Sequence, residues 1–266
     1  MRFSLSGRLI ETTSTSYTMD WPAFVDLARH AGYDAVNPRD GQIDPALRCN
    51  RPDELLRTLA DAVLTISLVW GRLDRGPIEP RVFKDKLVFL EAGGGDVMVI
   101  GYPQDVERVR EYCDLSAGTS VSLAIACHIN SPFEDLAAAT AFVREVARPN
   151  IGLAVDPANL HLAGRYPELA QLHEAAPFIS MVQLQGCVLA PDGPLRCKRF
   201  YERRTVAFSR VPLLEQDAID IRQFMADLRQ IGYDGVVNVN EPYLPDREAL
   251  ELATGTARML RGYLDE

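Results

Sequence analysis

The chain has 266 residues and a formal net charge of −9 at pH 7, from 28 Lys and Arg against 37 Asp and Glu. Hydrophobic residues make up 47% and charged residues 24% of the sequence, which is typical of a soluble globular protein and argues against disorder. Because no Lys/Arg block offsets the negative charge, we expect neither nucleic acid nor a membrane surface as a partner.

The N-terminal segment MRFSLSGRLIETT lacks the apolar core of a signal peptide, and the longest apolar run, near residues 62–70, is too short to cross a bilayer. We therefore expect a cytoplasmic protein. The five cysteines are an odd number with no Cys-x-x-Cys spacing, so neither a disulfide framework nor a zinc knuckle is predicted.

Strand-like and helix-like segments alternate along the whole chain. Runs rich in β-branched residues predict strands at residues 2–10, 34–38, 64–70, 96–101, 121–127, 151–156, 178–184 and 235–240. Amphipathic periodicity predicts helices between Asp20 and Gly32 and at residues 52–62, 80–93, 104–116, 134–148, 166–175, 219–231 and 247–263. Eight units of about 33 residues predict an α/β fold, a single (β/α)8 TIM barrel over residues 1–266, with a doubly wound open sheet as the alternative.

Three local signals refine this outline. Asp20 is placed as an N-cap and Gly32 as a C-terminal stop, and the run Gly93–Gly95 is predicted to be a tight helix-to-strand turn. The segment at about 185–218, which follows the seventh strand, is predicted to be an irregular active-site loop.

In such a barrel the chemistry lies at the carboxyl ends of the strands. The fifth predicted strand ends in Ala126, Cys127 and His128, and strand alternation puts Ala126 and His128 on one face. His128 could act there as an acid, a base or a ligand, or it could be a hydrogen-bonded core histidine.

The sixth strand runs into Asp156, followed by Asn159 and His161. A carboxylate that ends a wholly apolar strand needs a cation, a donor network or a catalytic role to offset desolvation, although a capping role is the simpler alternative. The seventh strand offers the neutral amides of Gln183 and Gln185, which can orient a polyol.

The eighth strand ends in Asn240 and Glu241. Glu241 is a candidate base, but alternation turns it away from the face of Asn240 unless a bulge re-aims it, and a surface salt bridge is the simpler role. Arg39, Trp70 and Arg72 at earlier strand ends are candidates for holding a substrate anion or stacking on a sugar ring.

Four segments together resemble the xylose-isomerase-like, sugar phosphate isomerase/epimerase family. They are ARHAGYDAVNPRDG, LAIACH, GLAVDPANLHLAG and LRQIGYDGVVNVNE, which look like the second, fifth, sixth and eighth strand regions of that family. The resemblance covers nearly the whole chain and implies a TIM barrel that acts on a small sugar, keto-sugar or polyol-like substrate. The endonuclease-like branch is not expected, because its multi-zinc site needs more than the four histidines present here.

Members of this family usually bind Mn²⁺, Mg²⁺, Co²⁺ or Zn²⁺ through a Glu, an Asp, a His and a second Glu. The resemblance places these ligands at Ala126, Asp156, Gln183 and Asn240, so only Asp156 keeps a ligating side chain. We therefore expect no metal and no other cofactor. Two exceptions remain open: a one-residue shift that makes Glu241 the ligand, or a rebuilt site of His128, Asp156, His161 and Glu241.

Three hypotheses of function follow. The first is a metal-free isomerase, epimerase or lyase with His128 and Asp156 as the acid/base pair, together with Glu241 as a further candidate. The second is a non-catalytic barrel that binds a ligand or serves as a partner subunit. The third is a metal-dependent isomerase with a rebuilt site. Barrels of this family often form dimers or tetramers, so a homo-oligomer is compatible with the sequence.

Overall fold

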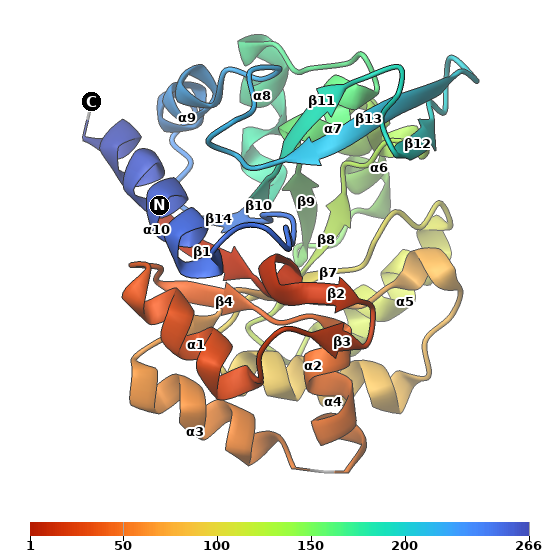
Figure 1. Ribbon diagram of the computed structural model, residues 1–266. Coiled ribbons are helices and arrows are strands. Elements are labelled where there is room, and N and C mark those ends of the chain that lie inside the picture. The colour runs from red at the N-terminus through yellow and green to blue at the C-terminus, as the bar shows by residue number, and fades with distance from the viewer. Residues whose placement is uncertain (50, 266) are drawn as a thin grey trace.

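The structure is a computed structural model that describes residues 1–49 and 51–265, and its centre is a parallel sheet (Figure 1). The strands are β1 (Arg2–Ser6), β4 (Ala35–Asn37), β5 (Thr65–Ile66), β6 (Leu68–Trp70), β7 (Val97–Val99), β8 (Ser122–Ala126), β9 (Ile151–Val155), β10 (Ile179–Leu184) and β14 (Val236–Val239), in the order β5-β4-β1-β14-β10-β9-β8-β7-β6. Because only Ser67 separates β5 from β6, the two ends of the sheet are pieces of one strand, and eight strand positions close into a barrel.

The helices form the outer layer of the barrel (Figure 1). They are α1 (Trp21–His30), α3 (Pro52–Ala62), α4 (Pro80–Ala92), α5 (Val106–Ser116), α6 (Leu136–Val146), α8 (Leu169–Ala175), α9 (Ile221–Gln230) and α10 (Ala249–Leu264). Each was predicted from periodicity, and the TIM barrel is confirmed. Among the described residues, no helix is both long and apolar enough to cross a membrane.

The predicted capping residues lie at the two ends of α1. Asp20 accepts a hydrogen bond from the backbone N–H of Ala23 at 3.0 Å, and Gly32 follows α1 with a φ of +85° that favours glycine. Gly94, with a φ of +74°, makes the turn between α4 and β7. These local predictions are confirmed.

Three elements differ from the sequence-based outline. The first strand ends at Ser6, because its hydroxyl accepts the backbone N–H of Arg8 at 3.3 Å and starts a 3₁₀ turn, η1 (Gly7–Ile10). Helix α2 (Asp40–Arg48) was missed because Gly41 and Pro45 obscure its pattern. Helix α7 (Pro157–Leu162) has six residues, too few to show a helical period.

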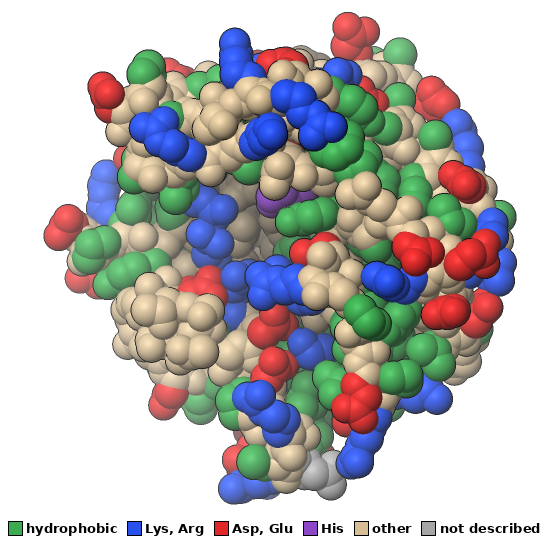
Figure 2. Space-filling model, turned by 90° about the vertical axis from the view of Figure 1, so that its right-hand side faces the viewer, with side chains coloured by type: hydrophobic (Ala, Val, Ile, Leu, Met, Phe, Trp, Pro, Cys, Tyr) green, Lys and Arg blue, Asp and Glu red, His purple; other side chains and the backbone are tan. Residues whose placement is uncertain are grey.

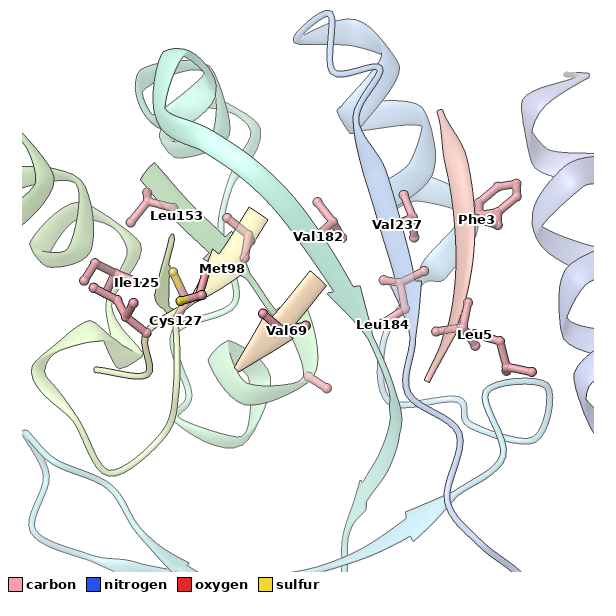
Figure 3. Close-up of a cluster of buried hydrophobic side chains, with 14 of the residues drawn as sticks. Phe3, Leu5, Val69, Met98, Ile125, Cys127, Leu153, Val182, Leu184 and Val237 are labelled. Atoms are coloured by element: carbon pink, nitrogen blue, oxygen red, sulfur yellow. The ribbon is translucent and has the colours of Figure 1, made fainter. Parts of the chain in front are cut away.

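The main core lies between the barrel and the helices. Alternate strand residues point outward into this layer, among them Phe3, Leu5, Val182, Leu184 and Val237, and all five side chains are fully buried (Figure 3). Burial of this apolar surface is the main force that closes the barrel.

The barrel interior has an apolar side and a polar side. Leu68, Val97, Val99, Ala124, Ala126, Ala154 and Met181 form the apolar cluster. On the polar side Ser4 and Ser67 lie 2.6 Å apart through their Oγ atoms, and Ser6 donates to Asn37 Oδ1 at 3.1 Å. The polar residues continue toward the carboxyl ends of the strands, where the candidate site lies.

The segment after β10 is an ordered sheet, so the predicted irregular loop at about 185–218 is wrong in this respect. Strands β11 (Gly186–Leu189), β12 (Leu195–Lys198) and β13 (Thr205–Val211) form an antiparallel sheet in the order β11-β13-β12. We call this sheet the lid; it extends beyond the carboxyl ends of β8 and β9 (Figure 1). In β13, Val206 and Phe208 are buried at alternate positions, which is the period of a strand with one covered face.

Candidate functional site

A cavity of about 220 Å³ lies between the barrel mouth and the lid. Its lining residues are Arg8, His128, Ile129, Asn159, Leu162, Gln185, Cys187, Leu195, Arg196, Cys197, Phe208 and Arg210. Figure 2 shows a hollow that holds a histidine and is bordered by Lys and Arg side chains. A larger surface hollow, of about 420 Å³ beside α10, lies away from the strand ends that carry chemistry in this fold.

Asp156 is the centre of a donor network beside this cavity. It is buried after β9, and its Oδ1 accepts the backbone N–H of Asn159 at 3.0 Å. Its Oδ2 accepts amide N–H groups from Asn159 at 2.7 Å, Gln183 at 3.1 Å and Gln185 at 2.6 Å. The capping role and the polar network therefore coexist in one carboxyl group.

Burial raises the pKa of the Asp156 carboxyl, while the hydrogen bonds from Asn159 and the charge of His128 act in the opposite direction. The three side-chain amides are fixed by this carboxylate. Two of them, from Asn159 and Gln185, also line the cavity, so Asp156 holds polar groups in place at its wall.

His128 forms another part of the cavity wall. Its Nδ1 lies 2.5 Å from the carbonyl oxygen of Ile129, and since a carbonyl can only accept, Nδ1 carries the proton. Nε2 of the neutral ring is therefore the atom with a free lone pair. Tyr102 stacks on the imidazole, with ring centroids 5.2 Å apart and planes at 25°.

Burial lowers the pKa of His128, which favours the neutral ring at pH 7. The hydrogen bond to Ile129 and the charge of Asp156 act in the other direction. Asp156 is thus placed to stabilise an imidazolium if the ring takes up a proton.

Two arginines at the cavity were missed by the sequence analysis. Arg8 lies in η1 and Arg210 lies on β13, and both line the same cavity as His128. The sequence predicts a strand at Arg8 and an irregular loop at Arg210, and neither assignment predicts that the side chain faces the barrel mouth. The alternation of Val206, Phe208 and Arg210 would have found the second.

Glu241 does not join this group. It is fully buried, and its carboxylate accepts the backbone N–H of Leu213 at 3.1 Å and the hydroxyl of Thr256 at 2.6 Å. Strand alternation has turned it toward α10, away from the face of Asn240. The prediction of Glu241 as a catalytic group is not supported by this position, and the simpler alternative of a surface salt bridge is also wrong.

The other candidates are engaged elsewhere or lie near the mouth without lining the cavity. Arg39 pairs with Glu11 at 3.0 Å. Arg72 pairs with Asp40 at 3.1 Å and lies 4.6 Å from the ring centroid of Trp70, whose indole Nε1 is buried without a partner in the described part of the chain.

His161 lies on α7, and burial together with Arg199 lowers its pKa. Asn240 is buried, and its backbone N–H donates to Leu184.

The lid is fixed to the barrel by a buried carboxylate. Glu134 accepts backbone N–H groups from Asn130 at 3.0 Å, Phe200 at 2.8 Å and Tyr201 at 3.0 Å. Arg199 Nε donates to the carbonyl of Leu162 at 2.8 Å. The turn between β12 and β13 is thereby held against the segments that follow β8 and β9.

The sequence and the structure were compared with known proteins. A family model described as the xylose isomerase-like TIM barrel matches residues 25–262. The chain belongs to this family. No match was found among curated proteins.

Solved structures share this barrel fold over nearly the whole chain. The IOLI protein with a bound zinc atom is 20% identical, with a TM-score of 0.74 and 98% of each chain covered. D-Psicose 3-epimerase from Clostridium cellulolyticum, solved with D-tagatose, is 15% identical, with a TM-score of 0.73 and 99% of each chain covered. The probable 3-DHS dehydratase AsbF from Bacillus anthracis is 14% identical, with a TM-score of 0.74, covering 98% of this chain and 99% of that one. At these identities the likeness shows the fold alone.

The side chains at the family's metal positions do not fit a divalent cation. Asp156 Oδ2 accepts three N–H groups, whereas a cation requires lone pairs from its neighbours. Ala126 offers no donor atom. Within residues 1–49 and 51–265, no three His, Cys, Asp or Glu side chains gather so as to hold a metal ion. In the rebuilt site of His128, Asp156, His161 and Glu241, the last residue points toward Leu213 and Thr256 and does not join the other three.

Proposed function

We propose that this xylose isomerase-like barrel is an isomerase, epimerase or lyase that acts on a small sugar, keto-sugar or polyol-like substrate by proton transfer, without a divalent metal. The observation that carries the proposal is the neutral His128, whose Nδ1–H is held by Ile129 and whose Nε2 is free to accept a proton. Solved structures of the same fold include an epimerase and a probable dehydratase, which supports chemistry of this class.

In this proposal His128 is the general base. Nε2 removes a proton from the carbon next to a carbonyl, and the same nitrogen delivers it to the neighbouring carbon of the enediolate in an isomerisation or to the departing hydroxyl in an elimination. An epimerisation would need a second donor on the opposite face of the carbon, so isomerisation and elimination fit a single base best. Asp156 does not touch the substrate; it stabilises the imidazolium and fixes the amides of Asn159 and Gln185. Those amides orient substrate hydroxyls at the cavity wall.

The test is the substitution His128→Gln, which keeps a polar side chain but removes the base. Turnover on a panel of aldoses, ketoses and hydroxy acids should fall by about 10²-fold or more, the usual contribution of a general base. His173→Ala, an exposed histidine on α8, serves as the control. Unchanged turnover in a folded His128→Gln variant would remove His128 from the mechanism.

A second candidate is a non-catalytic barrel that binds a ligand or serves as a partner subunit. It is favoured by one observation: the two family positions that usually carry glutamate are Ala126 and Asn240, neither of which moves protons at neutral pH. Tight binding of a panel compound without conversion, or activity only with a second protein, would support this function. Turnover by the isolated chain would exclude it.

A further inference from the structure

Three buried guanidinium nitrogens at the cavity have no hydrogen-bond partner among the described residues. They are Nε of Arg8 and both Nε and Nη1 of Arg210. Nε of Arg39, a third arginine nearby, also lacks a hydrogen bond, but it lies 3.0 Å from a carboxylate oxygen of Glu11 and so has a counter-ion. Buried N–H donors of a charged group are costly when unpaired, which makes the first two arginines an unexplained cost of the fold.

The two arginines also repel each other. Burial lowers the pKa of Arg8 to about 10, and the charges of Arg210 and Arg39 add to this effect. Burial likewise lowers the pKa of Arg210, against the attraction of Asp156. Two largely buried cations therefore line one small cavity, with Asp156 and Glu11 as the nearby opposite charges.

The two side chains reach the cavity from different parts of the fold. Arg8 belongs to the barrel, directly after β1, and Arg210 belongs to the lid, where β13 pairs it with Cys187 of β11. A ligand that contacts both would therefore join the lid to the barrel. Guanidinium groups present planar pairs of N–H donors that match the oxygens of a carboxylate or a phosphate.

We propose that Arg8 and Arg210 together bind the oxyanion of the substrate, which is a small organic acid or a sugar phosphate and not a neutral sugar. This inference rests on the proposed function and adds the substrate class to it. The volume of about 220 Å³ is below the 300 to 1,000 Å³ usual for drug-sized ligands, so the acid is a compact one. With its anion between the arginines, the rest of the molecule extends along the wall that carries His128, Asn159 and Gln185.

The experiment is calorimetric titration of the full chain with D-gluconate, glucose 6-phosphate, inorganic phosphate and neutral D-glucose at fixed ionic strength. The proposal predicts that at least one anion binds at least 10-fold more tightly than D-glucose. Gluconate against glucose 6-phosphate distinguishes a carboxylate from a phosphate. Equal and weak binding of all four compounds at millimolar concentrations would overturn the proposal.

Variants locate the contact. Arg8→Gln and Arg210→Gln should each weaken binding of the preferred anion by about 10-fold or more, while Arg204→Gln, an exposed arginine of the same lid, should leave it unchanged. Because buried N–H donors of both arginines lack hydrogen-bond partners in the free protein, the melting temperature without ligand should stay the same or rise in both variants. Arg8→Lys and Arg210→Lys, which keep the charge, should recover part of the affinity. Anion binding that is unaltered in both Gln variants contradicts the assignment.

Failure of this inference can be told apart from failure of the proposed function. His128→Gln should bind the anion as tightly as the natural protein while losing turnover. Turnover of a neutral sugar that is unaffected by Arg8→Gln and Arg210→Gln would overturn the anion site and leave the proton-transfer function in place. Arginine-dependent binding together with full activity of His128→Gln would keep the anion site and overturn the role of His128 in proton transfer.

Discussion

Glu241 is a buried carboxyl group whose titration should be visible in the stability of the protein. Burial raises its pKa to about 7, against the hydrogen bonds from Thr256 and Leu213. An unfolded glutamate titrates near about 4.3, so between these two values the folded state holds more protons than the unfolded state. The stabilisation by the protonated form is present at low pH and is lost as pH rises through about 7.

The comparison of the natural protein with Glu241→Gln, which mimics the protonated group, tests this point. The free energy of unfolding of the natural protein, relative to the variant, should fall by about 2 to 3 kcal/mol between pH 5 and pH 8. Urea unfolding at both pH values measures the difference. A difference that does not change with pH would mean that the carboxyl group titrates normally.

At the same scale, the sequence predicted part of the candidate site. His128, Asp156, Asn159, Gln183 and Gln185 were predicted from the strand ends, and the structure brings them together because parallel strands end at one edge. The direction of Glu241 followed from alternation with Asn240. The partner of Glu241 could not be predicted, because Leu213 and Thr256 reach it only through tertiary packing.

Among the elements, the lid is attached to the barrel partly through Glu134, which accepts backbone N–H groups of the turn between β12 and β13. Glu134→Ala removes the acceptor of three backbone N–H groups, two of them in the turn between β12 and β13. Charged hydrogen bonds of this kind contribute about 1.5 to 3 kcal/mol each, and the effect on local opening of the turn should be of that order.

Hydrogen exchange is the measurement for this prediction. The amides of Phe200 and Tyr201 should exchange at least about 10-fold faster in Glu134→Ala, while those of β9 at Leu153 and Val155 should be unaffected. Arg204→Ala, an exposed arginine of the same turn, is the matched control. Equal protection of the turn in both variants would show that other contacts hold the lid.

The elements also show where sequence patterns stop being informative. Helices of ten or more residues with an apolar face were predicted near their observed positions, because that length contains enough turns to recognise the helical spacing of apolar residues. Helix α7 and the three lid strands were missed. Helix α7 has six residues and β11 and β12 have four each, and the lid strands are separated by polar turns, so an irregular loop was the simpler interpretation.

For the whole molecule, eight repeated strand–helix units specify the barrel, while the chemistry depends on a few side chains at the carboxyl ends of the strands and in the lid. The family usually combines a metal with carboxylate bases. This chain instead surrounds Asp156 with amide donors and places Arg8, Arg210 and a neutral His128 at the cavity. Positive charge from arginine could thus replace positive charge from a metal in holding an oxyanion.

Metal content tests this account most directly. The natural protein and Asp156→Asn would be loaded with Mn²⁺, desalted and analysed by elemental mass spectrometry. The account predicts far less than one ion per chain in both proteins, because hydrogen-bond donors occupy the carboxylate oxygen that a cation would need. About one ion per natural chain, lost in Asp156→Asn, would contradict it and establish metal-assisted chemistry at this site.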